Sequence, residues 1–124
     1  DPRLREIAIL VVAREHNSQF EWCAHLEPAL KQGVSEKVIN IIRDNASVEG
    51  IDPVDAMVIK LGREIFSGTK VTEETYDSAL SHFGARGLVD FVTLMGGYAA
   101  TAAILKTFNM QLKPEWIPSL PIDE

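Results

Sequence analysis

The fold of this chain is decided by residues 4–13, Leu4-Arg5-Glu6-Ile7-Ala8-Ile9-Leu10-Val11-Val12-Ala13. The stretch is apolar around almost its whole circumference when it is placed on a helix, and a helix of that kind belongs in a core. Asp1 and Pro2 precede it, which gives an N-cap followed by proline at the first helical position. We therefore predict a central helix that runs from Asp1-Pro2 to about Arg14.

Start and stop signals divide the residues that follow into five more helices. Serine, threonine or aspartate caps open most of them, and glycine or asparagine closes them. The predicted ranges, each approximate at its ends, are 19–32, 35–45, 52–68, 72–84 and 87–107. Pro28 falls inside the first of these and should kink it.

The tail from Gln111 contains Pro114, Pro118 and Pro121, so we expect it to be extended. No stretch alternates between apolar and polar residues as a strand would. The sequence thus predicts an all-α bundle of about six helices, with a Pro-rich C-terminal tail, as a single domain over residues 1–124. The chain begins with Asp rather than Met, so we expect that it can be a piece of a longer one.

Composition narrows the classes of function. A net charge of −6 argues against a nucleic-acid partner, which would call for a basic face, and favours small-molecule or protein partners. Cys23 is the only cysteine, so an intrachain disulfide and a cysteine-based metal site are excluded. A lone cysteine and the lack of a recognisable signal peptide fit a cytoplasmic protein.

The apolar segment over residues 91–105 is too short and too rich in glycine and alanine for a membrane span, and Asp90 and Lys106 bound it. Small residues recur along it at helical spacing: Gly96, Ala99, Ala100 and Ala103. We predict that this side of the helix is buried against another helix, inside the subunit or between subunits.

Polar residues inside the apolar region mark a candidate site. Glu6 lies within the core helix, while Ser18, Glu21 and His25 share one face of the next helix because they are three and four residues apart. Two carboxyl groups and an imidazole between apolar helices can transfer protons. The structural alternative is an exposed Glu21–His25 pair with Glu6 pointing to water.

Each of these residues also has a separate interpretation. Glu21 can complete a capping box by reaching back to the backbone N–H of Ser18. His25 can be a buried histidine that serves stability alone, although its ordinary pKa suits acid–base work. Cys23 is about 200° around the helix from both, so we expect it to face away from the site as a small buried hydrophobe. A metal site is not predicted, because a set of two glutamates and one histidine lacks a second histidine.

The order of these residues resembles a known family. Glu6, an eleven-residue gap, Ser18-Gln19-Phe20-Glu21 and then Trp22-Cys23-Ala24-His25 are similar to the motif of the carboxymuconolactone decarboxylase family, which includes the AhpD alkylhydroperoxidase branch. The continuation over residues 29–38, Ala-Leu-Lys-Gln-Gly-Val-Ser-Glu-Lys-Val, is similar as well. The resemblance is closest over residues 3–45 and looser to about residue 107.

The resemblance implies an AhpD-like helical fold, a homo-oligomer and a small-molecule lyase without a cofactor. The peroxidase branch carries two redox cysteines with a histidine between them, where this chain has Ser18, Phe20 and Glu21. The decarboxylase branch needs no cysteine pair and is therefore the better match. It implies Glu6, Glu21 and His25 as catalytic residues. Two alternatives remain open, a peroxidase-like oxidoreductase and a non-catalytic helical oligomer.

Substrate binding in that reaction calls for a cation to hold a second carboxylate. Arg14, Arg43 and Arg86 are the arginines considered for this role, and the sequence does not choose among them.

Overall fold

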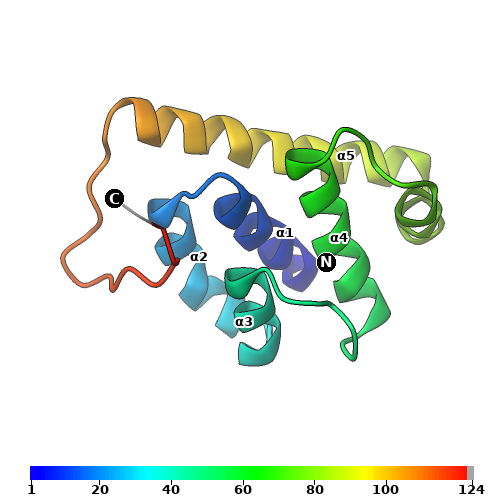
Figure 1. The fold of residues 1–124 in the computed structure, drawn as a ribbon, viewed down its shortest axis with the longest axis horizontal. Helices are drawn as coiled ribbons and strands as arrows, with labels where there is room; N and C mark the ends of the chain where they lie inside the picture. The colour runs from blue at the N-terminus through cyan, green and yellow to red at the C-terminus, as the bar shows by residue number, and fades with distance from the viewer. Residues whose placement is uncertain (123–124) are drawn as a thin grey trace.

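The computed structural model describes residues 1–122, which form an all-α arrangement of five helices (Figure 1). In this described part of the chain no β-strand is present. The helices are α1 (Pro2–Glu15), α2 (Gln19–Lys31), α3 (Glu36–Asp44), α4 (Pro53–Ser67) and α5 (Glu73–Thr107). The N-caps predicted at Asp1, Ser18, Ser35, Asp52 and Thr72 all accept a hydrogen bond from the first turn of their helix.

Helix α1 is the centre of the molecule, as its apolar sequence predicts. Every residue from Glu6 to Ala13 is buried, and the other four helices pack around it (Figure 1). Helix α4 comes close to α1 at Gly62, where a Cβ atom would lie 2.5 Å from Cγ1 of Val11. Glycine is required at this position because two helices meet there with no room for a side chain.

Two of the predicted helices are joined in one element. The ranges 72–84 and 87–107 both fall in α5, whose backbone leaves the helical region at Gly84, with φ 73° and ψ 168°. A positive φ is accessible to glycine without a steric cost. The expectation of six separate helices is therefore corrected to five, with a bend where the boundary was predicted (Figure 1).

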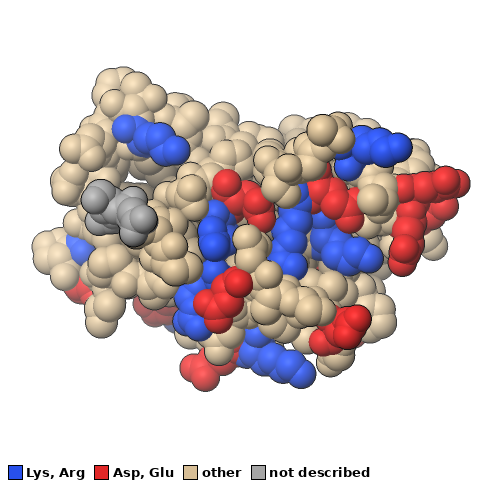
Figure 2. Space-filling view, in the orientation of Figure 1, with Lys and Arg blue, Asp and Glu red and all other residues tan. Residues whose placement is uncertain are grey.

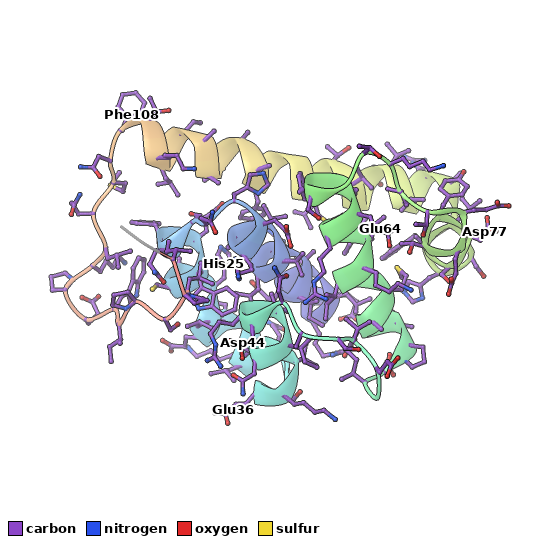
Figure 3. All side chains as sticks on the ribbon, viewed as in Figure 1. His25, Glu36, Asp44, Glu64, Asp77 and Phe108 are labelled. Carbon is purple, nitrogen blue, oxygen red and sulfur yellow. The ribbon has the colours of Figure 1, made fainter. Side chains whose placement is uncertain are left out.

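The second half of α5 leaves a long apolar face uncovered. Met95 and Ala102 are buried on its inner side, but Val89, Val92 and Ile104 are exposed on the outer side. Phe108, just beyond the helix, is 76% exposed and points away from the body (Figure 3). Both signs of charge mix over the lower half of the molecule, whereas the edge along the middle of α5 is largely uncharged (Figure 2).

The small-residue rows of α5 lie on this uncovered side. Gly96, Ala100 and Ala103 are exposed and Ala99 is half-buried, and a Cβ atom on Gly96 would meet nothing within 4 Å. Within the chain, Ala99 packs against the core, but Gly96, Ala100 and Ala103 do not have the predicted burial. The alternative, packing between subunits, stays a prediction. The sequence pattern shows which side of a helix carries small residues, but it does not show which element, if any, packs against that side.

Among residues 1–122, α5 is long and apolar enough to cross a membrane, and 17% of its most apolar window is buried in the fold. The whole helix is thus longer than the apolar segment 91–105, which we expected to be too short for a span. Core helices of soluble proteins, which are mostly buried, pass the same test. The feature by itself does not place the chain in a membrane.

The chain after α5 turns back onto α2 (Figure 1). Gln19 holds it, because its amide oxygen accepts from the backbone N–H groups of Ser119 and Leu120, and its amide nitrogen donates to the Leu120 carbonyl. The Trp22 indole N–H donates to Ser119 Oγ over 2.8 Å. Leu120 is buried in the core, so the tail covers one side of α2.

Candidate functional site

A tight turn sets α2 against α1 and so determines which side chains meet. Asn17 has a left-handed backbone, with φ 52°, and the Ser18 N–H donates to the Ala13 carbonyl over 2.8 Å. Ser18 Oγ then accepts from the backbone N–H of Glu21, which starts α2. The two helices consequently pack side by side, with Glu6 on α1 and His25 on α2 in facing positions.

Glu6 and His25 are in direct contact. Nδ1 of His25 lies 3.1 Å from Oε2 of Glu6 and 3.3 Å from Oε1. Glu6 is buried, and the His25 side chain, labelled in Figure 3, is 22% exposed. The prediction that the two groups lie within hydrogen-bond reach on neighbouring helices is confirmed. Because Nδ1 faces the carboxylate, Nε2 is the ring nitrogen that remains for a ligand.

Glu21 is buried in the same helix pair without a partner. It is 3% exposed, and neither carboxyl oxygen has a hydrogen-bond partner among the described residues. Burial raises the pKa of Glu21 to about 7, because an ionised carboxylate would lose its hydration there. The expected capping box is only half formed, since the Ser18 N–H donates to Ala13 instead of Glu21.

Sequence reasoning missed Tyr98 and Arg5. The Tyr98 ring from α5 packs edge-on against the His25 imidazole, with the ring centroids 5.4 Å apart. Arg5, exposed on α1, lies beside Tyr98, and this phenol and the nearby Glu6 carboxylate raise the pKa of its guanidinium. The position of Arg5 next to Glu6 was the available signal, but the contact with α5 depends on tertiary packing.

Four arginines are already engaged with carboxylates or backbone carbonyls: Arg3, Arg14, Arg43 and Arg63. Arg14 Nε donates to the Arg43 carbonyl over 2.7 Å, and the Arg43 guanidinium pairs with Asp44. Two of the three arginines considered as substrate cations are thus occupied. Arg86 is exposed near the bend of α5.

Cys23 faces the tail, away from the Glu6–His25 contact. Its Sγ lies 3.6 Å from the Ile117 carbonyl oxygen. The thiol is buried, and burial raises its pKa, which disfavours the reactive thiolate. The orientation agrees with the position of Cys23 around α2.

Two cavities border α5. The larger, about 710 Å³, lies between the start of α2, the end of α5 and the tail, and Phe20 and Lys106 are among its lining residues. The smaller, about 470 Å³, lies at the start of α1 beside the bend of α5. Glu6, Glu21 and His25 line neither of them.

Within residues 1–122, no three His, Cys, Asp or Glu side chains are grouped to hold a metal ion. No protein-family model, curated protein or solved structure matches this chain.

Proposed function

We propose that this chain is a small-molecule lyase of the carboxymuconolactone decarboxylase type, with an AhpD-like fold, whose proton-transfer site is built from Glu6, Glu21 and His25. The observation that supports this most directly is the contact of 3.1 Å between Glu6 Oε2 and His25 Nδ1 in a largely apolar setting. A carboxylate on one imidazole nitrogen orients the ring and stabilises its protonated form.

The proposed reaction divides its work among these residues. The carboxylate of a carboxylated lactone or related acid leaves as CO2, and its bonding electron pair passes into a conjugated system that ends in a carbonyl group. His25, protonated on Nε2, delivers a proton to the carbon that accepts it, and Glu6 stabilises the imidazolium. Glu21, with a pKa of about 7, can hold or release a proton near neutral pH. No metal or other cofactor is required for these steps.

A homo-oligomer is part of this proposal. The uncovered apolar face of α5, together with its exposed small residues, supplies a surface on which a second copy can pack. We also propose that the protein is cytoplasmic, as the sequence led us to expect.

A non-catalytic helical oligomer is the second candidate. It is favoured by the position of both cavities away from the Glu6–His25 contact, and by Trp22, which fills the core at 0% exposure. In that case Glu6 and His25 form a structural pair only. The peroxidase alternative has less support, because Cys23 is buried and is the only thiol.

The test is a turnover assay on a panel of carboxylated lactones and related acids, in which CO2 release and deuterium incorporation from D2O are followed. We expect wild-type turnover, and a loss of about 100-fold or more in His25→Gln and Glu6→Gln, the range that a lost general acid produces. His82→Gln, which changes an exposed histidine on α5, should keep full activity. Equal rates in His25→Gln and the wild type would remove the proposed site, and no turnover on any acid would favour the non-catalytic candidate.

A further inference from the structure

Glu6 fixes the His25 imidazole at one of its ring atoms. Nδ1 lies 3.1 Å from Oε2 and 3.3 Å from Oε1 of the carboxyl group. A contact at a single atom leaves the ring free to tilt about that atom. Proton delivery sets a stricter condition, because the nitrogen that carries the proton must be held within about 0.5 Å of its productive position. A second contact on the imidazole is therefore required for the chemistry proposed for His25.

Tyr98 supplies this second contact from a third helix. Its ring centroid lies 5.4 Å from the centroid of the His25 imidazole, and the two ring planes are 89° apart. Aromatic rings prefer such a T-shaped arrangement, which sets the angle between their planes. Glu6 on α1 thus sets the position of Nδ1, and Tyr98 on α5 sets the tilt of the ring.

The position of Tyr98 on α5 is fixed by two buried neighbours. Met95 lies three residues before it and Ala102 lies four residues after it, and both are buried. On a helix these spacings place all three residues on one face. Tyr98 is itself half-buried and packs against the core. Its ring is therefore carried by a packed helix rather than by a loop, which is the support that a precise site needs.

Arg5 holds the other end of the Tyr98 ring. The hydrogen bond to the Tyr98 phenol is the main cause that raises the pKa of the Arg5 guanidinium. Within residues 1–122 Arg5 makes no salt bridge to a carboxylate. Arg5 is exposed, so we expect it to contribute less than the aromatic ring does. Because Arg5 and Glu6 are adjacent on α1, one segment of this helix supports both contacts of the imidazole.

These contacts leave part of the imidazole open. The His25 side chain is 22% exposed although Glu6 and Tyr98 both lie against it. A histidine that serves the core alone gains nothing from an exposed part. A ring that is held on two sides and open on the remainder is the arrangement that proton transfer to a ligand requires.

We infer that Tyr98 is a positioning residue of the proton-transfer site: its ring sets the tilt of the His25 imidazole, and Arg5 holds Tyr98 in place. The inference rests on the proposed function in taking His25 as the proton donor. Tyr98 acts through His25 and does not itself exchange a proton with the substrate. The orientation of the imidazole is a property of the free protein, so it can be measured without a substrate.

The first measurement is the tautomer of His25 in the full chain, from long-range ¹H–¹⁵N spectra at about pH 9, where an imidazole is neutral. The signals of His25 are identified by their absence in His25→Gln. We expect the form with the proton on Nδ1 to predominate in the wild type, because Nδ1 faces the Glu6 carboxylate. Tyr98→Leu should lower the ratio of this form to the other about two- to tenfold, the factor that corresponds to a T-shaped aromatic pair.

Tyr76→Leu is the matched control, because it removes the other tyrosine of α5, which is 48% exposed. It should leave the tautomer ratio of His25 unchanged. Tyr98→Phe keeps the aromatic ring and loses only the hydroxyl that Arg5 contacts, so its effect should be smaller than that of Tyr98→Leu.

The second measurement is turnover on the acid that the wild type accepts. Tyr98→Leu should lower kcat about tenfold or more and change KM by less than about twofold, because a misaligned donor costs rate rather than binding. Tyr98→Phe and Arg5→Gln should each give a smaller loss, and the double variant should lose no more than either, since both remove the same contact. Arg86→Gln, which changes an exposed arginine of α5, should behave as the wild type.

An unchanged tautomer ratio in Tyr98→Leu, or a loss that appears in KM alone, would overturn the inference. If Tyr98→Leu does not fold, additive losses in Tyr98→Phe and Arg5→Gln would overturn it instead. Full turnover in Tyr98→Leu together with lost turnover in His25→Gln keeps the proposed function and removes the role of Tyr98. A shifted tautomer ratio in a protein that turns over no acid removes the proposed function but supports the positioning of His25 by Tyr98.

Discussion

At the scale of single residues, Glu21 is the side chain whose surroundings depart most from those of an ordinary glutamate. Glu21 is 3% exposed, its carboxyl group has no hydrogen-bond partner among residues 1–122, and burial raises its pKa to about 7. In the unfolded chain the same group titrates near 4.5. Between those two values the unfolded chain has released the proton and the folded chain has kept it, so the free energy of unfolding falls as pH rises through this window.

We therefore expect Glu21→Gln to change the pH dependence of stability. The wild type should lose up to about 3 kcal/mol relative to the variant between pH 4.5 and pH 7, because each pKa unit corresponds to about 1.4 kcal/mol. Urea unfolding at several pH values measures this difference. Glu49→Gln, an exposed loop substitution, should show the same pH dependence of the free energy of unfolding as the wild type. If the difference in free energy of unfolding between Glu21→Gln and the wild type stays constant from pH 4.5 to pH 7, Glu21 is ionised in the folded protein.

The thiol of Cys23 gives a second expectation at this scale. Burial and the raised pKa should make its reaction with a disulfide reagent at least about tenfold slower in the folded protein than in urea, because only the accessible thiolate reacts. Cys23→Ser should leave any turnover unchanged, since Sγ faces Ile117. Fast labelling of the folded protein, or loss of peroxide reduction in the variant, would bring back the peroxidase alternative.

At the scale of helices, glycine has two different uses. Gly62 allows α4 to approach α1 closely, whereas Gly96 lies on the open side of α5. Gly62→Ala should cost about 1–3 kcal/mol by overpacking against Val11, and Gly96→Ala should stabilise the isolated chain by up to about 1 kcal/mol through helix propensity. Thermal unfolding of the two variants is the measurement. Equal effects of the two substitutions would contradict the α1–α4 contact.

Among the side chains of α2 that hold the tail, Gln19 makes the most hydrogen bonds. Gln19 makes three hydrogen bonds to the backbone of Ser119 and Leu120, so Gln19→Ala leaves those groups without partners. We expect a loss of about 2–3 kcal/mol in the free energy of unfolding, given the usual cost of unmade buried hydrogen bonds. Gln111→Ala, an exposed change in the same tail, should be close to neutral. Hydrogen exchange of the Leu120 amide should rise in the first variant only.

At the scale of the whole molecule, the surface is larger than a monomer of this mass normally has. The accessible area is 7211 Å² for 13.7 kDa, against about 6,600 Å² from the usual scaling with mass. Three of the large hydrophobic side chains that are exposed, Val89, Val92 and Ile104, lie on the uncovered side of α5. A second copy packed on this side would bury them.

We expect sedimentation of the wild type to give a multiple of 13.7 kDa. Val92→Asp places a charge in the middle of the uncovered face and should yield the single chain with little loss of helix. Lys37→Asp on α3 is the control. It changes the charge by more than Val92→Asp does, but it lies away from that face, so the variant should sediment with the same mass as the wild type. A wild type that sediments as one chain would leave the apolar face of α5 without the partner proposed for it.

The sequence by itself determined where the helices begin and most of their ends, although the boundary predicted near Gly84 is a bend inside α5. Caps such as Ser18 and Asp52 act through hydrogen bonds within their own turn, so they can be predicted from the local sequence alone. The uniformly apolar stretch of α1 fixed it as the core helix for the same local reason. The contact between Glu6 and His25 was also predictable, because a short turn leaves two neighbouring helices few ways to pack.

Only the tertiary structure decided which residues pack against each face of a helix. The position of Arg5 beside Tyr98 and the stack of Phe83 on Phe91 depend on how α5 bends over α1. The small residues around Gly96 gave no indication that their side is open. The capping role expected of Glu21 failed because the Ser18 N–H found Ala13 in the turn. Contacts between segments far apart in the chain follow from the packing of the whole core, which local patterns do not encode.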